Sequence, residues 1–140
     1  MKLEYFLIKG FRRIRETKIV CGEATFLIGE NNIGKSSVLA AMEIFFSSQS
    51  NLDPQDYFFC EEPFHQTDEV VLEAKFSDLP VEAQKWKGFK GRIFTEEIND
   101  IQTDCIYYRK TFSRNAPLKR EMKSRRKSLK DQYGNCKSFS

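Results

Sequence analysis

Runs of apolar residues near the N-terminus predict strands. Leu3 to Ile8 are almost all apolar or aromatic, and the stretches from Lys18 to Cys21 and from Ala24 to Ile28 repeat this pattern. Gly10 and Gly22, which suit turns, separate the runs. We therefore expect three short strands in this part of the chain.

A helical pattern begins after Gly34. Apolar residues recur at helical spacing, at Val38, Met42 and Phe45, with Leu39 and Phe46 beside them. This spacing predicts a helix of about three turns with one broad apolar face, from near Lys35 to near Phe46.

Alternation of apolar and polar residues marks two later segments, 70–76 and 106–112, and predicts strands with one face toward water. Between the helix and these strands, residues 51–69 show no sustained period, and we expect a long surface excursion with an aromatic patch at Tyr57, Phe58 and Phe59. Residues 81–86 suit a short helix. The second half should therefore be mostly antiparallel and rich in strands.

Composition excludes several classes of protein. The chain is 40% hydrophobic and holds 13 Phe, so it can form a core and is not disordered throughout. No window reaches the ~18 apolar residues of a membrane span, and Glu4 precedes any apolar core, unlike in a signal peptide. We expect a cytoplasmic protein without a membrane partner. The cysteines lack a C-x-x-C pair, which favours free thiols over a zinc site or a disulfide framework.

Charge is unevenly distributed although the net charge is only +3. Residues 1–113 hold 14 basic and 18 acidic residues, whereas residues 114–140 hold 9 and 2. Such a run is typical of a solvated helix or a mobile loop, and it is also where affinity for nucleic acid would concentrate. The candidate contacts to a nucleic-acid backbone are Lys119, Arg120, Lys123, Arg125, Arg126, Lys127 and Lys130.

One motif carries chemistry. The run Gly29-Glu30-Asn31-Asn32-Ile33-Gly34-Lys35-Ser36 fits G-x-x-x-x-G-K-[ST], the Walker A phosphate loop, and it stands between an expected strand and the expected helix. The two glycines let the main chain wrap closely around an anion, whose phosphates the N–H groups cradle. Lys35 supplies a charge for the β- and γ-phosphates, and the Ser36 hydroxyl is an oxygen ligand for Mg²⁺. The motif predicts binding of ATP with Mg²⁺.

A family resemblance rests on this motif and on Leu7-Ile8-Lys9-Gly10-Phe11-Arg12. Together they resemble the N-terminus of the RecF/SMC-type ABC ATPases, and look most like the OLD-family ATP-dependent endonucleases. Those proteins begin with a strand, an N-F-R or G-F-R turn, a return hairpin and a loop of the form G-E-N-N-x-G-K-S. The resemblance is close over residues 1–48 and looser to about residue 113.

The resemblance implies an α/β fold of mixed α+β character, the N-terminal lobe of a P-loop ATPase head of the ABC type with an antiparallel β-subdomain. That lobe would span residues 1–113, with the phosphate loop at 29–37. Residues 114–140 would form a basic, exposed segment, with the domain incomplete at its C-terminus. Asn31 would reach the γ-phosphate and Ser37 the α-phosphate. Arg12 and Arg13 would lie near the nucleotide or DNA, or would simply be exposed hairpin arginines.

Two functions remain open from the sequence. The first is an ATP-binding lobe that couples nucleotide binding to DNA processing or phage defence, with a homo-oligomer or a partner protein engaged through the ATPase head. The alternative is a truncated, non-hydrolysing P-loop protein that acts by associating with a partner. We assign no catalytic residue, since no Walker B run, signature helix or switch His is found. The chain alone should therefore show little hydrolysis.

Overall fold

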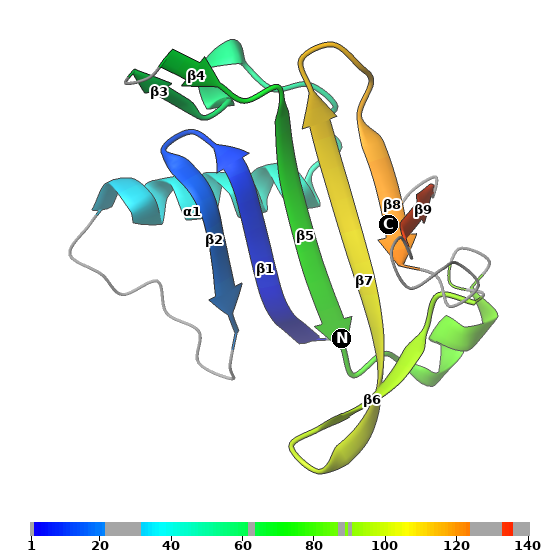
Figure 1. Cartoon of the computed structure of the whole chain (residues 1–140). Coiled ribbons are helices and arrows are strands. Elements are labelled where there is room, and N and C mark those ends of the chain that lie inside the picture. The colour runs from blue at the N-terminus through cyan, green and yellow to red at the C-terminus, as the bar shows by residue number, and fades with distance from the viewer. Residues whose placement is uncertain are drawn as a thin grey trace.

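The computed structural model describes residues 2–21, 32–61, 64–86, 89, 91–123 and 133–135. Within them, one antiparallel sheet has the strand order β2-β1-β5-β7-β8-β9, and β6 pairs with β7 (Figure 1). Its strands are β1 (Lys2–Phe11), β2 (Ile14–Val20), β5 (Glu69–Ser77), β6 (Phe94–Ile98), β7 (Ile101–Ser113), β8 (Lys119–Lys123) and β9 (Tyr133–Asn135). The other elements are helix α1 (Asn32–Phe46), a hairpin of β3 (Phe59–Glu61) and β4 (Phe64–Gln66), and the 3₁₀ turns η1 (Pro54–Asp56) and η2 (Val81–Lys85).

These elements confirm the expected antiparallel strands and the short helix near residue 81. They also make the described fold strand-dominated, with a single α-helix, so the α/β label fits it only in part. The strand expected from Ala24 to Ile28 lies outside the described residues.

Helix α1 crosses one face of the sheet, and the main core lies between the two (Figure 1). Alternate residues of β1, β5 and β7 point to this face, including Phe6, Leu72 and Ile106, which are completely buried. The Phe45 ring of α1 packs edge-on against Phe6 and Tyr108, with ring centroids 5.3 and 5.6 Å apart. These contacts fix the C-terminal turn of α1 on the sheet.

Helix α1 differs from its sequence prediction in its start and in its apolar face. It begins at Asn32, inside the phosphate-loop motif, and not near Lys35. Its buried residues are Ser37, Val38, Ala41, Ile44 and Phe45, whereas Leu39 and Phe46 are 53% and 55% exposed. The prediction of one broad apolar face was therefore wrong for Leu39 and Phe46, because each follows a buried residue by one position, about 100° around the helix.

The segment after α1 also departs from its prediction. Tyr57 was expected on a surface aromatic patch, but it is 5% exposed and belongs to the core. The physical reason is main-chain pairing with the β1–β2 turn. The Phe58 N–H donates to the Gly10 carbonyl at 2.8 Å, and the Arg12 N–H donates to the Asp56 carbonyl at 2.7 Å.

The basic segment contains a strand where a solvated helix or loop was expected. Strand β8 pairs with β7 in the register Arg109↔Glu121 and Lys110↔Arg120. Glu121 and Met122 are buried, so the predicted exposure of this segment is wrong for these two residues. The sheet thus continues past residue 113. Pairing with β7 and the burial of Met122 stabilise β8, and the number of apolar residues in the segment does not reveal this support.

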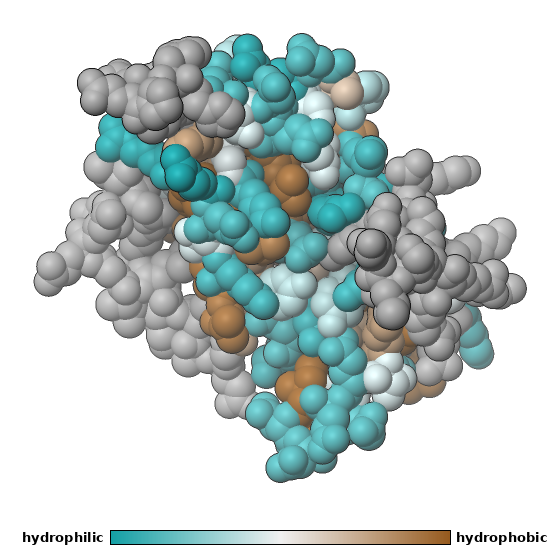
Figure 2. Space-filling model, in the orientation of Figure 1, coloured by the Kyte–Doolittle hydropathy of each residue, from teal (hydrophilic) through white to brown (hydrophobic). Residues whose placement is uncertain are grey.

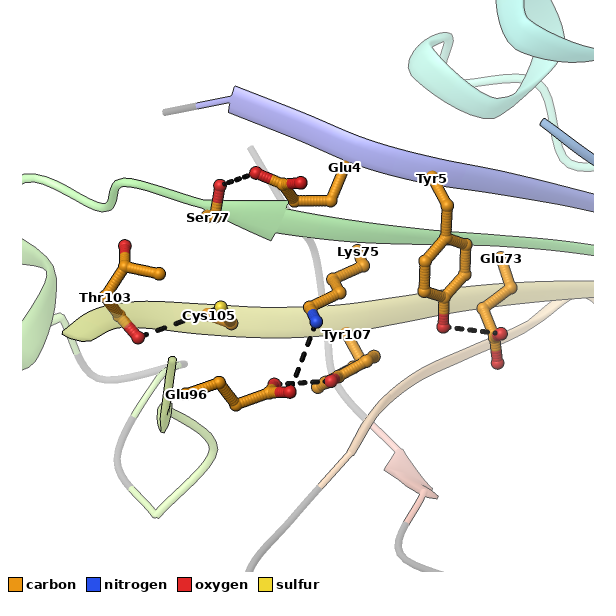
Figure 3. Close-up of polar contacts among 9 residues, drawn as sticks. All are labelled: Glu4, Tyr5, Glu73, Lys75, Ser77, Glu96, Thr103, Cys105 and Tyr107. Carbon is orange, nitrogen blue, oxygen red and sulfur yellow. Dashed lines mark hydrogen bonds and ion pairs between the residues drawn. The ribbon is translucent and has the colours of Figure 1, made fainter. Parts of the chain in front are cut away.

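The sheet face opposite α1 is largely hydrophilic (Figure 2). On it, Lys75 pairs with Glu96 at 3.2 Å, and Glu96 also accepts a hydrogen bond from the Tyr107 hydroxyl (Figure 3). The Tyr5 hydroxyl donates to Glu73 at 3.0 Å. These contacts link β1, β5, β6 and β7 on the side away from the helix.

Two further expectations concern thiols and membranes. Cys21 and Cys105 are buried, as predicted, and burial raises the pKa of the Cys105 thiol to about 11. Among the described residues, no helix is long and apolar enough to cross a membrane.

Candidate nucleotide-binding site

The phosphate-loop motif runs directly into helix α1. Gly29, Glu30 and Asn31 lie outside the described residues, and the main chain of Asn32, Ile33, Gly34 and Lys35 forms the first turn of the helix. Ser36 is exposed, whereas Ser37 is buried. An exposed Ser36 hydroxyl is accessible to a metal ion, and the buried position of Ser37 leaves it less accessible to a bound nucleotide.

The two ends of α1 differ in how their charge is balanced. The first turn contains no acidic residue and the last turn contains no basic one. The N-terminus of a helix carries partial positive charge and unpaired N–H groups, and acidic side chains there would compete with an incoming anion. The first turn of α1 therefore suits a phosphate group.

The opposite end of α1 is held by a residue from the sheet that sequence reasoning missed. Lys110 of β7 is 5% exposed, and its Nζ donates to the Phe45 carbonyl at 2.7 Å and to the Ser47 carbonyl at 3.0 Å. The available signal was its position in β7, because Lys110 has the same parity as Ile106, Tyr108 and Phe112, which are core residues. A lysine at a core position of a strand indicates a specific buried partner.

Arg12 is fixed in the β1–β2 turn. Its φ of 53° lies in the left-handed region, which is uncommon for residues other than glycine. The Arg12 Nε pairs with Asp56 Oδ1 at 2.9 Å, and the guanidinium lies 4.9 Å from the centroid of the Phe11 ring. Arg13 is exposed. Arg12 is thus a tethered side chain, whereas Arg13 fits the description of an exposed hairpin arginine.

Both arginines line an open cavity of about 500 Å³ between the β1–β2 turn and η1. The other residues that line it are Asp53, Gln55, Asp56 and Tyr57. Burial raises the pKa of Tyr57; Arg114 opposes this and Asp56 adds to it. The cavity therefore combines two guanidinium groups with carboxylates, an amide and a neutral phenol.

The three basic candidates that the structure describes, Lys119, Arg120 and Lys123, do not line this cavity. Lys119 and Arg120 lie on β8, and the Lys123 Nζ lies 4.4 Å from the centroid of the Tyr107 ring and 5.7 Å from that of Phe94. Lys123 thus has a packing role that the charge pattern did not indicate. Arg125, Arg126, Lys127 and Lys130 lie outside the described residues. No cluster of three potential metal ligands of the His, Cys, Asp or Glu type occurs within the described ranges.

Comparison with protein families places the chain in a class. The family model described as AAA ATPase domain matches residues 1–137, nearly the whole chain. The chain therefore belongs to the AAA ATPase domain family. This membership implies an ATP-binding function, typically with Mg²⁺. No curated protein matches the chain.

Proposed function

We propose that this chain is the ATP-binding lobe of an OLD/RecF-like ATPase head of the ABC type, which couples nucleotide binding to DNA processing or phage defence. The observation that carries the proposal is the junction between motif and helix. Residues 29–36 match the phosphate loop without a mismatch, and α1 begins inside that motif with no acidic residue in its first turn. The hairpin with Phe11 and Arg12 at its turn, placed ahead of the motif, also agrees with the proposal.

The proposed roles follow from the chemistry of each group. The main-chain N–H groups of residues 29–34 surround the phosphates, and Lys35 places a positive charge beside them. The exposed Ser36 hydroxyl fits a Mg²⁺ ligand, since this hard cation prefers oxygen donors. Asn31, Ser37, Arg12 and Arg13 complete the proposed set.

Titration calorimetry of the 140-residue chain with ATP and Mg²⁺ tests this function. We expect binding that Lys35→Ala weakens and that Lys85→Ala, a replacement of an exposed lysine in η2, leaves unchanged. We expect little or no steady-state hydrolysis. Absence of ATP binding by the unmodified chain would contradict the proposal. Turnover that Lys35→Ala abolishes would show that the chain contains its own hydrolytic groups.

A second candidate is a non-hydrolysing P-loop protein that acts through a partner protein. Leu39 and Phe46 favour it, because both are exposed apolar side chains of α1 and lie seven residues apart on one side of the helix, where a partner surface can contact both. Sedimentation of the chain with and without ATP distinguishes the candidates in part. A stable complex that forms equally well without ATP and with Lys35→Ala supports association as the function.

A further inference from the structure

The C-terminal end of α1 is held by an unusual contact. Lys110 occupies a core position of β7, on the sheet face that packs against α1, and its register partners are Leu72 and Arg120. A buried ammonium group is costly unless it is hydrogen-bonded, because it loses its hydration. Lys110 meets this requirement with two short hydrogen bonds to carbonyl groups at the end of α1. The chain thus retains a cation where an apolar residue would ordinarily lie.

Lys110 supplies what the last turn of α1 lacks. That turn has no basic residue of its own, and the C-terminus of a helix carries partial negative charge and unpaired carbonyl groups. The Ile44 carbonyl accepts hydrogen bonds from the Ser47 N–H at 3.2 Å and the Ser47 hydroxyl at 2.8 Å. The Lys110 Nζ donates to the Phe45 and Ser47 carbonyls. One side chain of the sheet therefore caps both the last turn of α1 and the residue just beyond it.

The geometry points to Lys110 as a positioning residue for nucleotide binding. This inference rests on the proposed function, because α1 carries Asn32 to Ser37 of the phosphate loop at its other end. A helix of 15 residues is a rigid rod about 22 Å long, so fixing one end sets the axial position of the other. Phosphate binding by main-chain N–H groups depends on position to a fraction of an ångström. Lys110 thus controls nucleotide affinity without touching the nucleotide.

Lysine-to-methionine substitutions provide the test, because they keep most of the side-chain volume and remove the cation. We expect Lys110→Met to weaken ATP binding about tenfold, which corresponds to about 1.4 kcal/mol. The matched control is Lys75→Met, which removes a mostly buried lysine from the opposite face of the same sheet, where it pairs with Glu96 (Figure 3). It should change the dissociation constant less than twofold. Circular dichroism and denaturant unfolding of both variants report whether each is folded under the binding conditions.

The outcomes separate this inference from the proposed function. Absence of ATP binding by the unmodified chain would overturn both the proposed function and the positioning role of Lys110. If the unmodified chain binds ATP and Lys110→Met changes the dissociation constant less than twofold, the positioning role alone is overturned. The same holds if Lys75→Met loses as much affinity as Lys110→Met.

A second measurement needs no variant and therefore stands if Lys110→Met does not fold. ATP binding should slow amide hydrogen exchange at Ile44 to Ser47, the end of the helix remote from the phosphate loop, because one rigid element joins the two ends. Unchanged exchange there upon ATP binding would contradict the positioning role.

Discussion

Gly10 offers a sharp test of how the β1–β2 hairpin supports the candidate site. Its φ is +74°, in the left-handed region that side-chain-bearing residues rarely adopt. A Cβ added at this position would lie 2.8 Å from the Glu69 carbonyl oxygen and 3.1 Å from the Thr67 Cγ2. The carbonyl belongs to the main chain of β5, so it cannot move aside cheaply. Gly10 also accepts the hydrogen bond from the Phe58 N–H, which holds η1 and Tyr57 near Arg12.

The expected loss of unfolding free energy for Gly10→Ala combines two effects. The left-handed conformation costs an alanine about 1–2 kcal/mol. Relief of the close contact with Glu69 requires a small backbone shift, which costs about another 1–2 kcal/mol. The sum is about 2–4 kcal/mol, or a fall in Tm of about 6–12 °C for a chain of this length. Gly10→Asn should recover about 1 kcal/mol of this loss, because asparagine tolerates the left-handed region but brings the same Cβ.

Urea unfolding of the unmodified chain, Gly10→Ala and Gly10→Asn measures these differences at constant m-value. The expected order of stability is glycine, then asparagine, then alanine. A loss below about 0.5 kcal/mol for Gly10→Ala would refute both the close approach and the strain argument. Equal losses for alanine and asparagine would leave the close approach standing and remove the conformational term.

Three further predictions concern the motif, the basic segment and the sheet. Lys35→Ala should weaken ATP binding with or without metal, whereas Ser36→Ala should weaken it mainly when Mg²⁺ is present. Calorimetry in Mg²⁺ and in EDTA checks this. Equal losses of affinity for Ser36→Ala in the two buffers would exclude Ser36 as a metal ligand. Replacing Lys123, Arg125, Arg126 and Lys127 together by Ser should weaken DNA binding to all sequences alike and flatten its salt dependence, while ATP affinity stays nearly unchanged. Fluorescence anisotropy measures the DNA affinity. DNA binding that the quadruple variant retains would contradict the prediction. Burial raises the pKa of Glu96, but hydrogen bonds from Tyr107 and Lys75 outweigh it and lower the pKa below 4.5. The stabilisation from Glu96 is therefore fully present above about pH 4.5 and declines as the pH falls through the lowered pKa of the folded chain. The difference in unfolding free energy between the unmodified chain and Glu96→Gln should therefore shrink on acidification. A constant difference from pH 7 to 3 would contradict this.

The sequence predicts most of the sheet because burial in it follows simple alternation. Val70, Leu72, Ala74 and Phe76 are all buried, and each residue between them is only partly exposed. Strand β6 is less visible, since it carries only two apolar residues and depends on its pairing with β7. A local residue pattern does not show that a strand elsewhere in the chain will pair with the segment.

The candidate site also has one part that the sequence reveals and one part that it does not. The phosphate-loop motif is recognisable because its chemistry needs particular residues at fixed spacing. The partners of Arg12 and the cap on α1 are not, because they join residues 44 and 65 positions apart in the chain. Nothing in the sequence identifies Asp56 as the partner of Arg12, and the position of Lys110 in its strand indicates a buried partner without identifying it. The fold defines these partners, because it places Asp56 beside the exposed Arg12 and Lys110 against the buried Phe45 carbonyl.

Lys123 shows why charge counting overstates the DNA-binding potential of the basic segment. Its ammonium lies over the Tyr107 ring and near Glu96, a carboxylate whose pKa it helps to lower. A cation engaged with a ring and a carboxylate offers less to a phosphate than a fully hydrated one, because DNA would have to compete with contacts already made. Lys119 is exposed at the other end of the same strand and has greater access to a polyanion. Any DNA affinity of β8 should therefore depend more on Lys119 than on Lys123, and loss of Lys123 should act mainly through the packing of β6 and β8 against β7.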